Sequence, residues 1–395
     1  MEMKITLNNT YFTTHQKKDC NGCGVCALKC PRKAITMKED DEGFLYPIVD
    51  FHKCINCNLC KKICPNKNYS INDKIQTYIA INKNEKDLMN SSSGGCFLPI
   101  AKYIINKKGV VFGAAYDKNL KVIHDYVEQE KDLIKFQGSK YVRSDLKNSY
   151  EMVKEFLEKD RYVLFSGTPC QCQGLKTYLN KEFSKLYTCE IICHANPSPK
   201  VFKYYKEYLE KRQNKKIIDI KFRSKENGWH NQSPIIIYED GTKEEESLYF
   251  YSGFVKELLN RPSCHNCRFC SSNRLSDFTI GDAWGIREID NSIEDNDTGI
   301  SLLCINTDKG EKLKKYLEGF LLLKETDTTV AFEHNHYKNV PMHKNRDKFY
   351  KGISDGTING TNVLDYMKKY TKVSIIRRIF NKTKRMAKRI LKKTL

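Results

Sequence analysis

Residues 20–31 read CNGCGVCALKCP, and the pattern returns 34 positions later, where residues 54–65 read CINCNLCKKICP. Three cysteines spaced by two residues let one short loop wrap three corners of a cubic 4Fe-4S cluster. In two-cluster ferredoxins, the fourth cysteine of each run ligates the other cluster. The sequence therefore predicts two clusters at the front of the chain. The predicted ligands are Cys20, Cys23, Cys26 and Cys64 for one cluster and Cys54, Cys57, Cys60 and Cys30 for the other.

Zinc is the alternative metal for these runs, because it also takes sites of four cysteines. The spacing, and the Pro31 and Pro65 that close the two runs, favour iron–sulfur clusters. Gly22 and Gly24 leave room for backbone N–H groups to turn toward the sulfur atoms. We expect residues 1–70 to form a ferredoxin-like module, with a short strand on each side of a turn at DDEG.

The length of 395 residues suggests two or three domains. The chain contains 17 cysteines, but no basic start followed by an apolar stretch and no apolar run long enough to cross a membrane. We therefore expect neither a signal peptide nor a transmembrane helix. The expected location is cytoplasmic, where thiols serve metal sites more often than disulfides.

The formal net charge is +20, and residues 372–395 supply half of it with ten Lys or Arg and no acid. Apolar residues in this tail recur at three- and four-residue steps, which predicts an amphipathic helix. An anionic membrane surface uses both the apolar stripe and the cations, so we expect the tail to hold the protein at the inner membrane face. An acidic partner protein, docking on the chain's own core and a nucleic-acid tail are the alternatives.

Apolar strands alternate with helices after the polar segment 71–76, which we interpret as a linker. This alternation predicts an α/β (α+β) core with a mixed or largely parallel sheet. Strands are expected at 77–82, 109–116, 120–128, 161–167, 186–193, 217–225, 233–241, 274–286 and 300–307. Helices are expected at about 95–107, 146–158 and 201–212, with another after Pro169.

Nine cysteines follow the front module. Cys96, Cys189 and Cys304 stand alone on apolar segments and are expected to be core residues. The others lie in loops at strand ends, where α/β folds place their sites. These are Cys170, Cys172, Cys193, Cys264, Cys267 and Cys270.

The stretch CHNCRFC at 264–270 suits two kinds of metal site. One is a zinc knuckle that uses His265 or a distant cysteine, and the other is a third iron–sulfur cluster. Because two clusters are already predicted, another redox centre is the more coherent interpretation.

Six motifs occur in order along the core. They are SSSGGCF (91–97), GSKYVRS (138–144), FSGTPCQCQGL (165–175), ICHANPSPKVF (192–202), RPSCHNC (261–267) and SDFTIGDAWGI (276–286). Together they resemble the family of beta subunits of coenzyme F420 hydrogenases and dehydrogenases, over about residues 75–345. The front module is similar to an extension found in many relatives. The resemblance implies a flavoprotein, normally with FAD, and an iron–sulfur cluster in the core.

Carried over residue by residue, the resemblance implies a core cluster held by Cys170, Cys193, Cys264 and Cys267. The family more often has an aliphatic residue and a lysine where this chain has Cys172 and Cys270, so these two are candidate substitute ligands. Ala195 stands where the family has glycine. The resemblance implies a division into a flavin-binding part at 76–160 and a part at 161–345 with the cluster and the flavin or substrate site. The basic tail would then span 346–395.

The physical properties of two motifs agree with a flavin dinucleotide. Ser93, Gly94 and Gly95 precede a helix, whose free N–H groups and dipole suit a phosphate. The 138–140 stretch supplies a tight turn, a hydroxyl and a cation, although ordinary exposed turns share this composition. The expected cofactor-binding residues are Ser93, Gly94, Gly95, Gly138, Ser139, Lys140, Tyr141, Gly167, Thr168 and Pro169.

We therefore expect an iron–sulfur, flavin-dependent oxidoreductase, with no catalytic residue assigned. Its partners would be a ferredoxin-like electron donor or acceptor and a small-molecule or deazaflavin-like substrate, and a link to surface polysaccharide biosynthesis is a further hypothesis. The alternative is a nucleic-acid- or partner-binding protein with structural metal clusters. Because the motifs are Gly- and Pro-rich turns and not Lys/Arg stripes, no nucleic-acid partner is expected.

Overall fold

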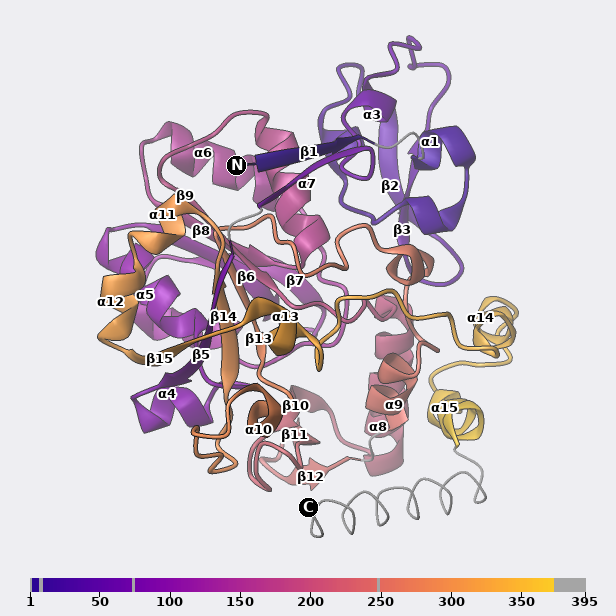
Figure 1. The fold of residues 1–395 in the computed structure, drawn as a ribbon. Helices are drawn as coiled ribbons and strands as arrows, with labels where there is room; N and C mark the ends of the chain where they lie inside the picture. Colours follow the sequence, from indigo (N-terminus) through magenta and orange to yellow (C-terminus); the bar gives the residue numbers. More distant parts are fainter. Residues whose placement is uncertain (1, 7–9, 73–74, 247–248, 373–395) are drawn as a thin grey trace.

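The computed structural model describes residues 2–6, 10–72, 75–246 and 249–372. A small front module, indigo in Figure 1, lies on one side of a larger α/β core. The amphipathic helix expected beyond residue 372 lies outside the described residues.

The front module contains two antiparallel strand pairs, β1 with β4 and β2 with β3. The short strands expected on each side of the DDEG turn are confirmed by β2 and β3. The 71–76 segment differs from the prediction, because its first two residues belong to β4 and Gln76 begins the first core strand. The elements are β1 (Glu2–Thr6), α1 (Tyr11–Thr14), η1 (Lys17–Asp19), α2 (Val25–Leu28), β2 (Ile35–Glu39), β3 (Leu45–Val49), α3 (Leu59–Lys62) and β4 (Asn68–Asn72).

The core contains an eight-stranded sheet in the order β15-β5-β14-β13-β9-β8-β6-β7. The neighbours β13-β9-β8-β6 run parallel, and the flanking pairs are antiparallel, so the prediction of an α/β core with a mixed sheet is confirmed. The strands are β5 (Gln76–Asn82), β6 (Val110–Tyr116), β7 (Val122–Val127), β8 (Val163–Gly167), β9 (Leu186–Ile191), β13 (Phe278–Asp282), β14 (Ser301–Ile305) and β15 (Leu321–Thr326).

Both faces of this sheet are buried, which explains the continuous apolar runs of its parallel strands. Along β8, Leu164 belongs to the core on the α5 side, whereas Val163 and Phe165 belong to the core under α6 and α7. The helices around the sheet are α4 (Glu85–Met89), α5 (Phe97–Asn106), η2 (Glu130–Phe136), α6 (Ser149–Glu158), α7 (Pro169–Leu179), α10 (Ile286–Ile289), α11 (Asp308–Glu311), α12 (Lys314–Glu318) and α13 (Thr328–Phe332).

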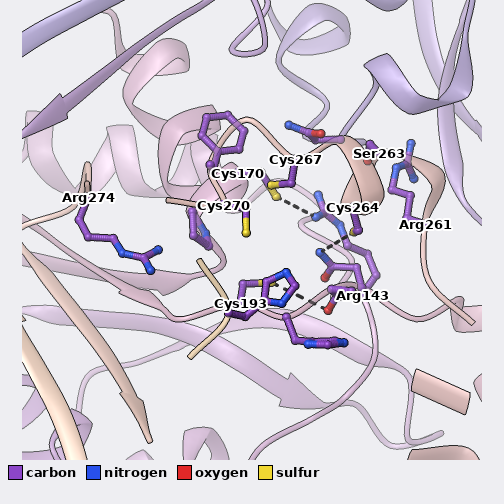
Figure 2. Close-up of a pocket in the computed structure, with 16 residues that line it drawn as sticks. Arg143, Cys170, Cys193, Arg261, Ser263, Cys264, Cys267, Cys270 and Arg274 are labelled. Atoms are coloured by element: carbon purple, nitrogen blue, oxygen red, sulfur yellow. Dashed lines mark hydrogen bonds between the residues drawn. The ribbon is translucent and has the colours of Figure 1, made fainter. Parts of the chain in front are cut away.

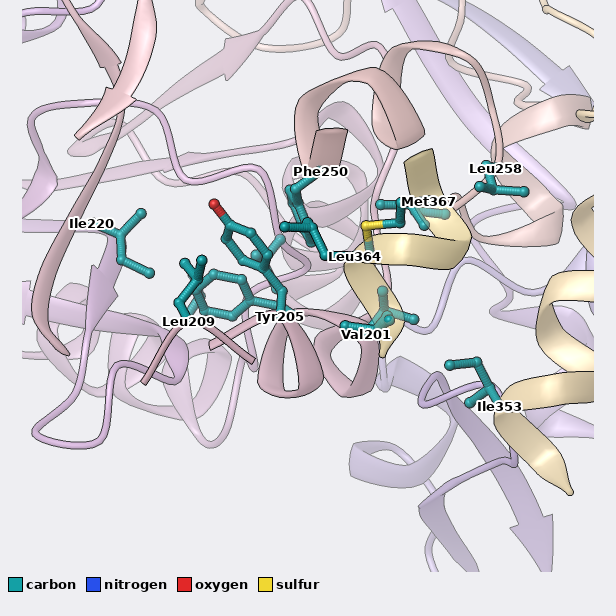
Figure 3. Packing of buried hydrophobic residues seen from close by; sticks show 14 of the residues in the cluster. Val201, Tyr205, Leu209, Ile220, Phe250, Leu258, Ile353, Leu364 and Met367 are labelled. Carbon is teal, nitrogen blue, oxygen red and sulfur yellow. The ribbon is translucent and has the colours of Figure 1, made fainter. Parts of the chain in front are cut away.

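A second layer of the core combines a three-stranded antiparallel sheet with helices (Figure 3). The rings of Tyr205 and Phe250 pack against each other at a tilt in its centre, with centroids 4.8 Å apart. Pro199, expected in a loop, occupies the first turn of α8, where proline is well tolerated. The elements are α8 (Pro199–Gln213), β10 (Ile217–Ser224), β11 (Ser233–Tyr238), β12 (Lys243–Glu245), α9 (Tyr249–Val255), η3 (Pro262–Asn266), α14 (Arg346–Ser354) and α15 (Val363–Thr371).

Ion pairs and carbonyl contacts fix the front module to the core. Buried Arg346 forms a two-pronged pair with Glu42, with N···O distances of 3.2 and 2.5 Å. Buried Arg261 donates to the backbone carbonyl oxygens of Cys20 and Leu45 at 2.7 and 2.9 Å. Because such pairing compensates for the burial of a guanidinium, the two parts are held in one defined orientation.

Candidate redox site

The first front cysteine group, Cys20, Cys23, Cys26 and Cys64, gathers beside the core. Burial raises the pKa of the Cys23 thiol to about 12, and the nearby Cys64 and Cys20 thiols raise it as well. Burial likewise raises the pKa of Cys64 to about 11, with Cys20 adding to the shift. When deprotonated, these cysteines repel one another, and bound iron would neutralise their negative charge. The residues therefore fit the 4Fe-4S cluster predicted for them.

Backbone N–H groups of the front module donate to cysteine sulfur atoms of both predicted ligand sets. The Gly22 N–H donates to Cys20 Sγ at 3.4 Å, and the Ala34 N–H donates to Cys30 Sγ at 3.3 Å. Gly22 has a φ of +65°, and a Cβ there would lie 3.0 Å from Arg261 Nη1. Both conditions favour glycine, since it adopts positive φ without strain.

The second front group, Cys54, Cys57 and Cys60, lies on the loop that ends in α3. Burial raises the pKa of the Cys60 thiol, and the nearby Cys57 and Cys54 thiols contribute to the increase. Cys57 is exposed and Cys54 is half-buried. The three cysteines of this run therefore adjoin one another near solvent, as the spacing predicts. Among the described residues, no three His, Cys, Asp or Glu side chains converge closely enough to hold a single metal ion.

Five core cysteines surround one small cavity of about 30 Å³, which we call the inner pocket (Figure 2). Two come from the ends of neighbouring parallel strands: Cys170 follows β8 at the start of α7, and Cys193 follows β9. The other three come from η3 and the loop after it. The cysteines are Cys170, Cys193, Cys264, Cys267 and Cys270.

The inner pocket contains all four cysteines predicted for the core cluster. Burial raises the pKa of the Cys193 thiol well above its ordinary value, and Cys264, Cys170 and Cys267 add to the shift. Burial raises the pKa of Cys264 to about 11. Because bound iron would neutralise the repulsion between these neighbouring thiolates, the four cysteines fit an iron–sulfur cluster, as in the front module.

The structure separates the two candidate substitute ligands. Cys270 lines the inner pocket. Cys172 does not, because its position on α7 places it in the apolar core, where it is fully buried. Cys96, Cys189 and Cys304 are also buried among apolar residues, as expected for core cysteines.

Arg143 connects the inner pocket with the first front group. Its Nη1 donates to Cys170 Sγ at 3.3 Å, and its Nη2 donates to the Gly22 carbonyl oxygen at 3.2 Å. A Cβ added to Gly174 of α7 would lie 3.1 Å from Cys23 Cβ. Helix α7 therefore carries Cys170 on its first turn and touches the front module one turn later.

A much larger cavity, of about 610 Å³, opens on the other side of the loop after β9. We call it the large cavity. It shares Cys193, His194, Ala195, Asn196 and His336 with the inner pocket. Its volume falls in the range of sites for drug-sized ligands and cofactors.

Most predicted cofactor-binding residues line the large cavity. They are Ser93, Gly95, Gly138, Ser139, Lys140, Tyr141, Gly167 and Thr168. Pro169 lines the inner pocket instead. Gly94 lines neither cavity, because it packs on the sheet: a Cβ there would lie 2.3 Å from the Ala80 carbonyl oxygen. Gly94 is therefore a packing residue in this structure.

The first turn of α5 faces this cavity through Gly95, Cys96, Phe97 and Leu98. Cys96, at the N-cap, makes no side-chain capping bond, so the helix N-terminus keeps unsatisfied donors. Across from it, the Ser139 N–H donates to Ser92 Oγ at 2.7 Å. The two predicted phosphate-binding segments are thus joined directly, and they fit an anionic cofactor.

Several cavity residues were not predicted from the sequence. Arg223 forms a two-pronged pair with Asp282, with both N···O distances 2.8 Å, and Trp284 stacks on Trp229. Asp282 and Trp284 belong to the SDFTIGDAWGI motif, and this motif is the sequence feature that could have indicated their place at the cavity. Arg223 comes from β10, and only the fold brings it to the cavity.

Buried His124 illustrates how hydrogen bonds fix a side chain at the cavity wall. Its Nε2 lies 2.9 Å from the Ser166 carbonyl oxygen, which can only accept, so Nε2 carries the proton. Its Nδ1 therefore accepts from Ser144 Oγ at 2.9 Å. Burial lowers the pKa of His124 to about 4, so the ring is neutral at pH 7.

The comparisons with known proteins match the two parts of the chain separately. Residues 19–78 match the model of a 4Fe-4S dicluster domain. Residues 160–329 match the model for the C terminus of the coenzyme F420 hydrogenase/dehydrogenase beta subunit. The dicluster match confirms the prediction of iron–sulfur clusters in the front module.

Two curated archaeal proteins are similar to the chain at low identity. A coenzyme F420-dependent sulfite reductase from Methanocaldococcus jannaschii is 25% identical over 325 residues, which cover 76% of this chain and 46% of that protein. An F(420)H(2) dehydrogenase subunit of Methanosarcina mazei is 25% identical over 167 residues, 40% of this chain and 47% of that protein. The chain spans about half the length of these relatives.

One similar solved structure is described as a xenon derivatization of the F420-reducing [NiFe] hydrogenase complex from Methanosarcina barkeri. The match covers 76% of this chain and 92% of the matched chain in that structure. The TM-score is 0.44 at 16% identity. Within the described part of the chain, no helix is both long and apolar enough to span a bilayer.

The fold, the cysteine groups and the sequence matches together relate this chain to iron–sulfur oxidoreductases. Residues 160–329 match the coenzyme F420 hydrogenase/dehydrogenase beta-subunit family, and a match to a 4Fe-4S dicluster domain precedes them.

Proposed function

We propose that this protein is an iron–sulfur flavoenzyme in which the large cavity holds FAD and the inner pocket holds a third 4Fe-4S cluster. The observation that carries the proposal is the wall shared by the two cavities, because Cys193 and its neighbours line both. A bound flavin exchanges two electrons with a small molecule and one electron at a time with iron–sulfur centres. A flavin and a cluster on the two sides of a shared wall would be close enough for this exchange.

The chain's own residues supply a consistent site for a dinucleotide. The α5 N-terminus and the Ser92–Ser139 pair offer donors to its phosphates. Apolar side chains such as Phe136 and Ile280 line the same cavity and suit a flat ring system. Lys140 adds a cation at this edge.

The proposed substrate is a small reducible molecule of the deazaflavin class, in keeping with the relatives that are named for coenzyme F420. The large cavity is the proposed place for it, beside the flavin. A link to surface polysaccharide biosynthesis stays a prediction. So do a cytoplasmic location and attachment of the tail to the inner membrane face.

Anaerobic purification followed by iron, sulfide and flavin analysis tests the proposal. The expected composition is about twelve irons per chain, four for each of three clusters, together with one FAD released on denaturation. Flavin absorption peaks above a broad iron–sulfur shoulder would support the flavoenzyme. Iron without flavin would overturn it in favour of a protein with structural clusters.

A further inference from the structure

The outer end of the front module exposes apolar side chains next to the second cysteine group. We call residues 51–62 the outer loop; it ends in α3, near the top of Figure 1. Phe51 is 80% exposed and Ile55 is 60% exposed. A single exposed apolar residue needs no explanation, but two in one loop that also carries three cysteines form a surface suited to contact.

The outer loop is also basic. It contains Lys53, Lys61 and Lys62 and no Asp or Glu. Asp50 borders it, with a carboxylate oxygen 3.4 Å from Lys53 Nζ. An apolar centre with a cationic rim is complementary to a partner that is apolar at its contact and acidic around it.

The two front cysteine groups differ in exposure. Cys23 of the first group packs in the core beneath α7 together with Cys170, and it is not exposed. Cys57 of the second group is exposed. Cys57 is the one exposed cysteine among those described, so the second group is the more accessible of the two front groups to a protein arriving from solvent.

We propose that the outer loop is the docking surface for a small, acidic iron–sulfur carrier protein of the ferredoxin class, an inference that rests on the proposed function. In each encounter the reduced carrier loses one electron and the front module gains one, with no bond made or broken. Two encounters supply the two electrons that reduction of a small molecule requires, and its protons come from solvent. Such transient redox contacts are small and depend on salt.

The experiment measures binding and electron transfer between the full-length holoprotein and a purified acidic two-cluster ferredoxin. Phe51→Ser and the Lys53→Glu/Lys62→Glu double variant are compared with matched controls outside the front module. Ile134→Ser removes an apolar residue that is 65% exposed, and Lys118→Glu/Lys131→Glu removes two exposed lysines. Iron and flavin contents are determined for each variant.

The outer-loop variants are expected to slow the second-order reduction by about tenfold or more and to raise the dissociation constant, because charge steering acts on the association rate. The control variants are expected to match wild type. Wild-type binding itself, which needs no variant, is expected to weaken steeply with added salt.

Equal behaviour of outer-loop and control variants, or wild-type binding that is indifferent to salt, would overturn the docking surface. Either result leaves the proposed function standing if the protein still contains flavin and three clusters. A holoprotein without flavin would instead overturn the proposed function, whatever the binding data show.

Discussion

Arg143 links the inner pocket to the front module. It is buried, and its guanidinium touches both Cys170 Sγ and the Gly22 carbonyl oxygen. A fixed positive charge beside a ligand sulfur stabilises the more negative, reduced state of a cluster held there. The side chain is therefore expected to raise the reduction potential of the core centre.

Replacing Arg143 with Gln should lower that potential. Loss of one charge-assisted hydrogen bond is worth roughly 1.5–3 kcal/mol, which corresponds to about 60–130 mV for one electron. A potentiometric titration followed by electron paramagnetic resonance measures the change. Arg161→Gln, at a surface pair with Glu128, is the control and should leave the potential unchanged. An unchanged potential in Arg143→Gln would contradict the assignment.

We expect Lys140 to make FAD binding in the large cavity depend on pH. Burial lowers the pKa of its ammonium to about 8, with Asp219 opposing the shift. Below that pH the side chain is charged and attracts an anionic cofactor, and above it the attraction is lost. FAD affinity for the apoprotein should therefore fall as the pH rises from 7 to 9.

Fluorescence titration of apoprotein with FAD measures this affinity. Lys140→Gln should bind roughly 10- to 100-fold more weakly at pH 7, as expected for a lost charge-assisted bond, and should show a flatter pH profile. Lys135→Gln, an exposed neighbour on η2, is the control. Wild-type affinity that stays constant across this pH range would contradict the role of Lys140.

Single residues were predictable where spacing carries the chemistry. The two front runs are short patterns whose spacing suits 4Fe-4S clusters. The four core cysteines were implied by the family resemblance instead, and the fold brings them to one pocket. Arg143, Arg223 and His336 were not assigned, because each reaches its partners only through contacts between distant segments. Gly94 was assigned to the cofactor, although its close approach to the sheet explains it fully.

At the scale of elements, the site depends on the loops after two neighbouring parallel strands. The carboxyl ends of β8 and β9 place Cys170 and Cys193 side by side, as such sheet edges generally do with functional residues. The loop from 261 to 270 closes the inner pocket from the opposite side and supplies three more cysteines. A 4Fe-4S cluster needs only four of the five.

Changing Cys193 to Ser should lower the iron content by about four atoms per chain. Changing Cys270 to Ser should leave it unchanged, because Cys270 is the extra thiol in this assignment. Iron analysis of the two variants, purified anaerobically side by side, measures the difference. The opposite pattern would make Cys270 a ligand and remove Cys193 from the set.

Elements were predictable where burial on both sides produces an unbroken apolar run, as in β6, β8 and β14. The edge strand β15 was missed, since its sequence LLLKET mixes apolar and charged residues and its exposure alternates irregularly. The last two residues of β4 fall in the polar segment 71–76, which the sequence indicates as a linker, because the pairing of β4 with β1 joins segments more than sixty residues apart.

At the scale of the whole molecule, the three cysteine groups lie in a sequence that ends at the large cavity. The second front group faces solvent, the first adjoins the inner pocket, and the inner pocket shares a wall with the cavity. The sequence alone could not place the front module, because its orientation rests on long-range contacts such as Arg346 with Glu42. The central claim is that this order is the path of electrons.

Rapid-mixing spectroscopy of the Cys193→Ser variant tests this path most directly. The flavin-loaded variant is mixed with a reduced ferredoxin while the iron–sulfur and flavin bands are followed separately. We predict that the front clusters are reduced at the wild-type rate while the flavin stays oxidised, although direct photoreduction still reduces it. Flavin reduction by the carrier at the wild-type rate would contradict the account, because electrons would then reach the large cavity without the inner pocket.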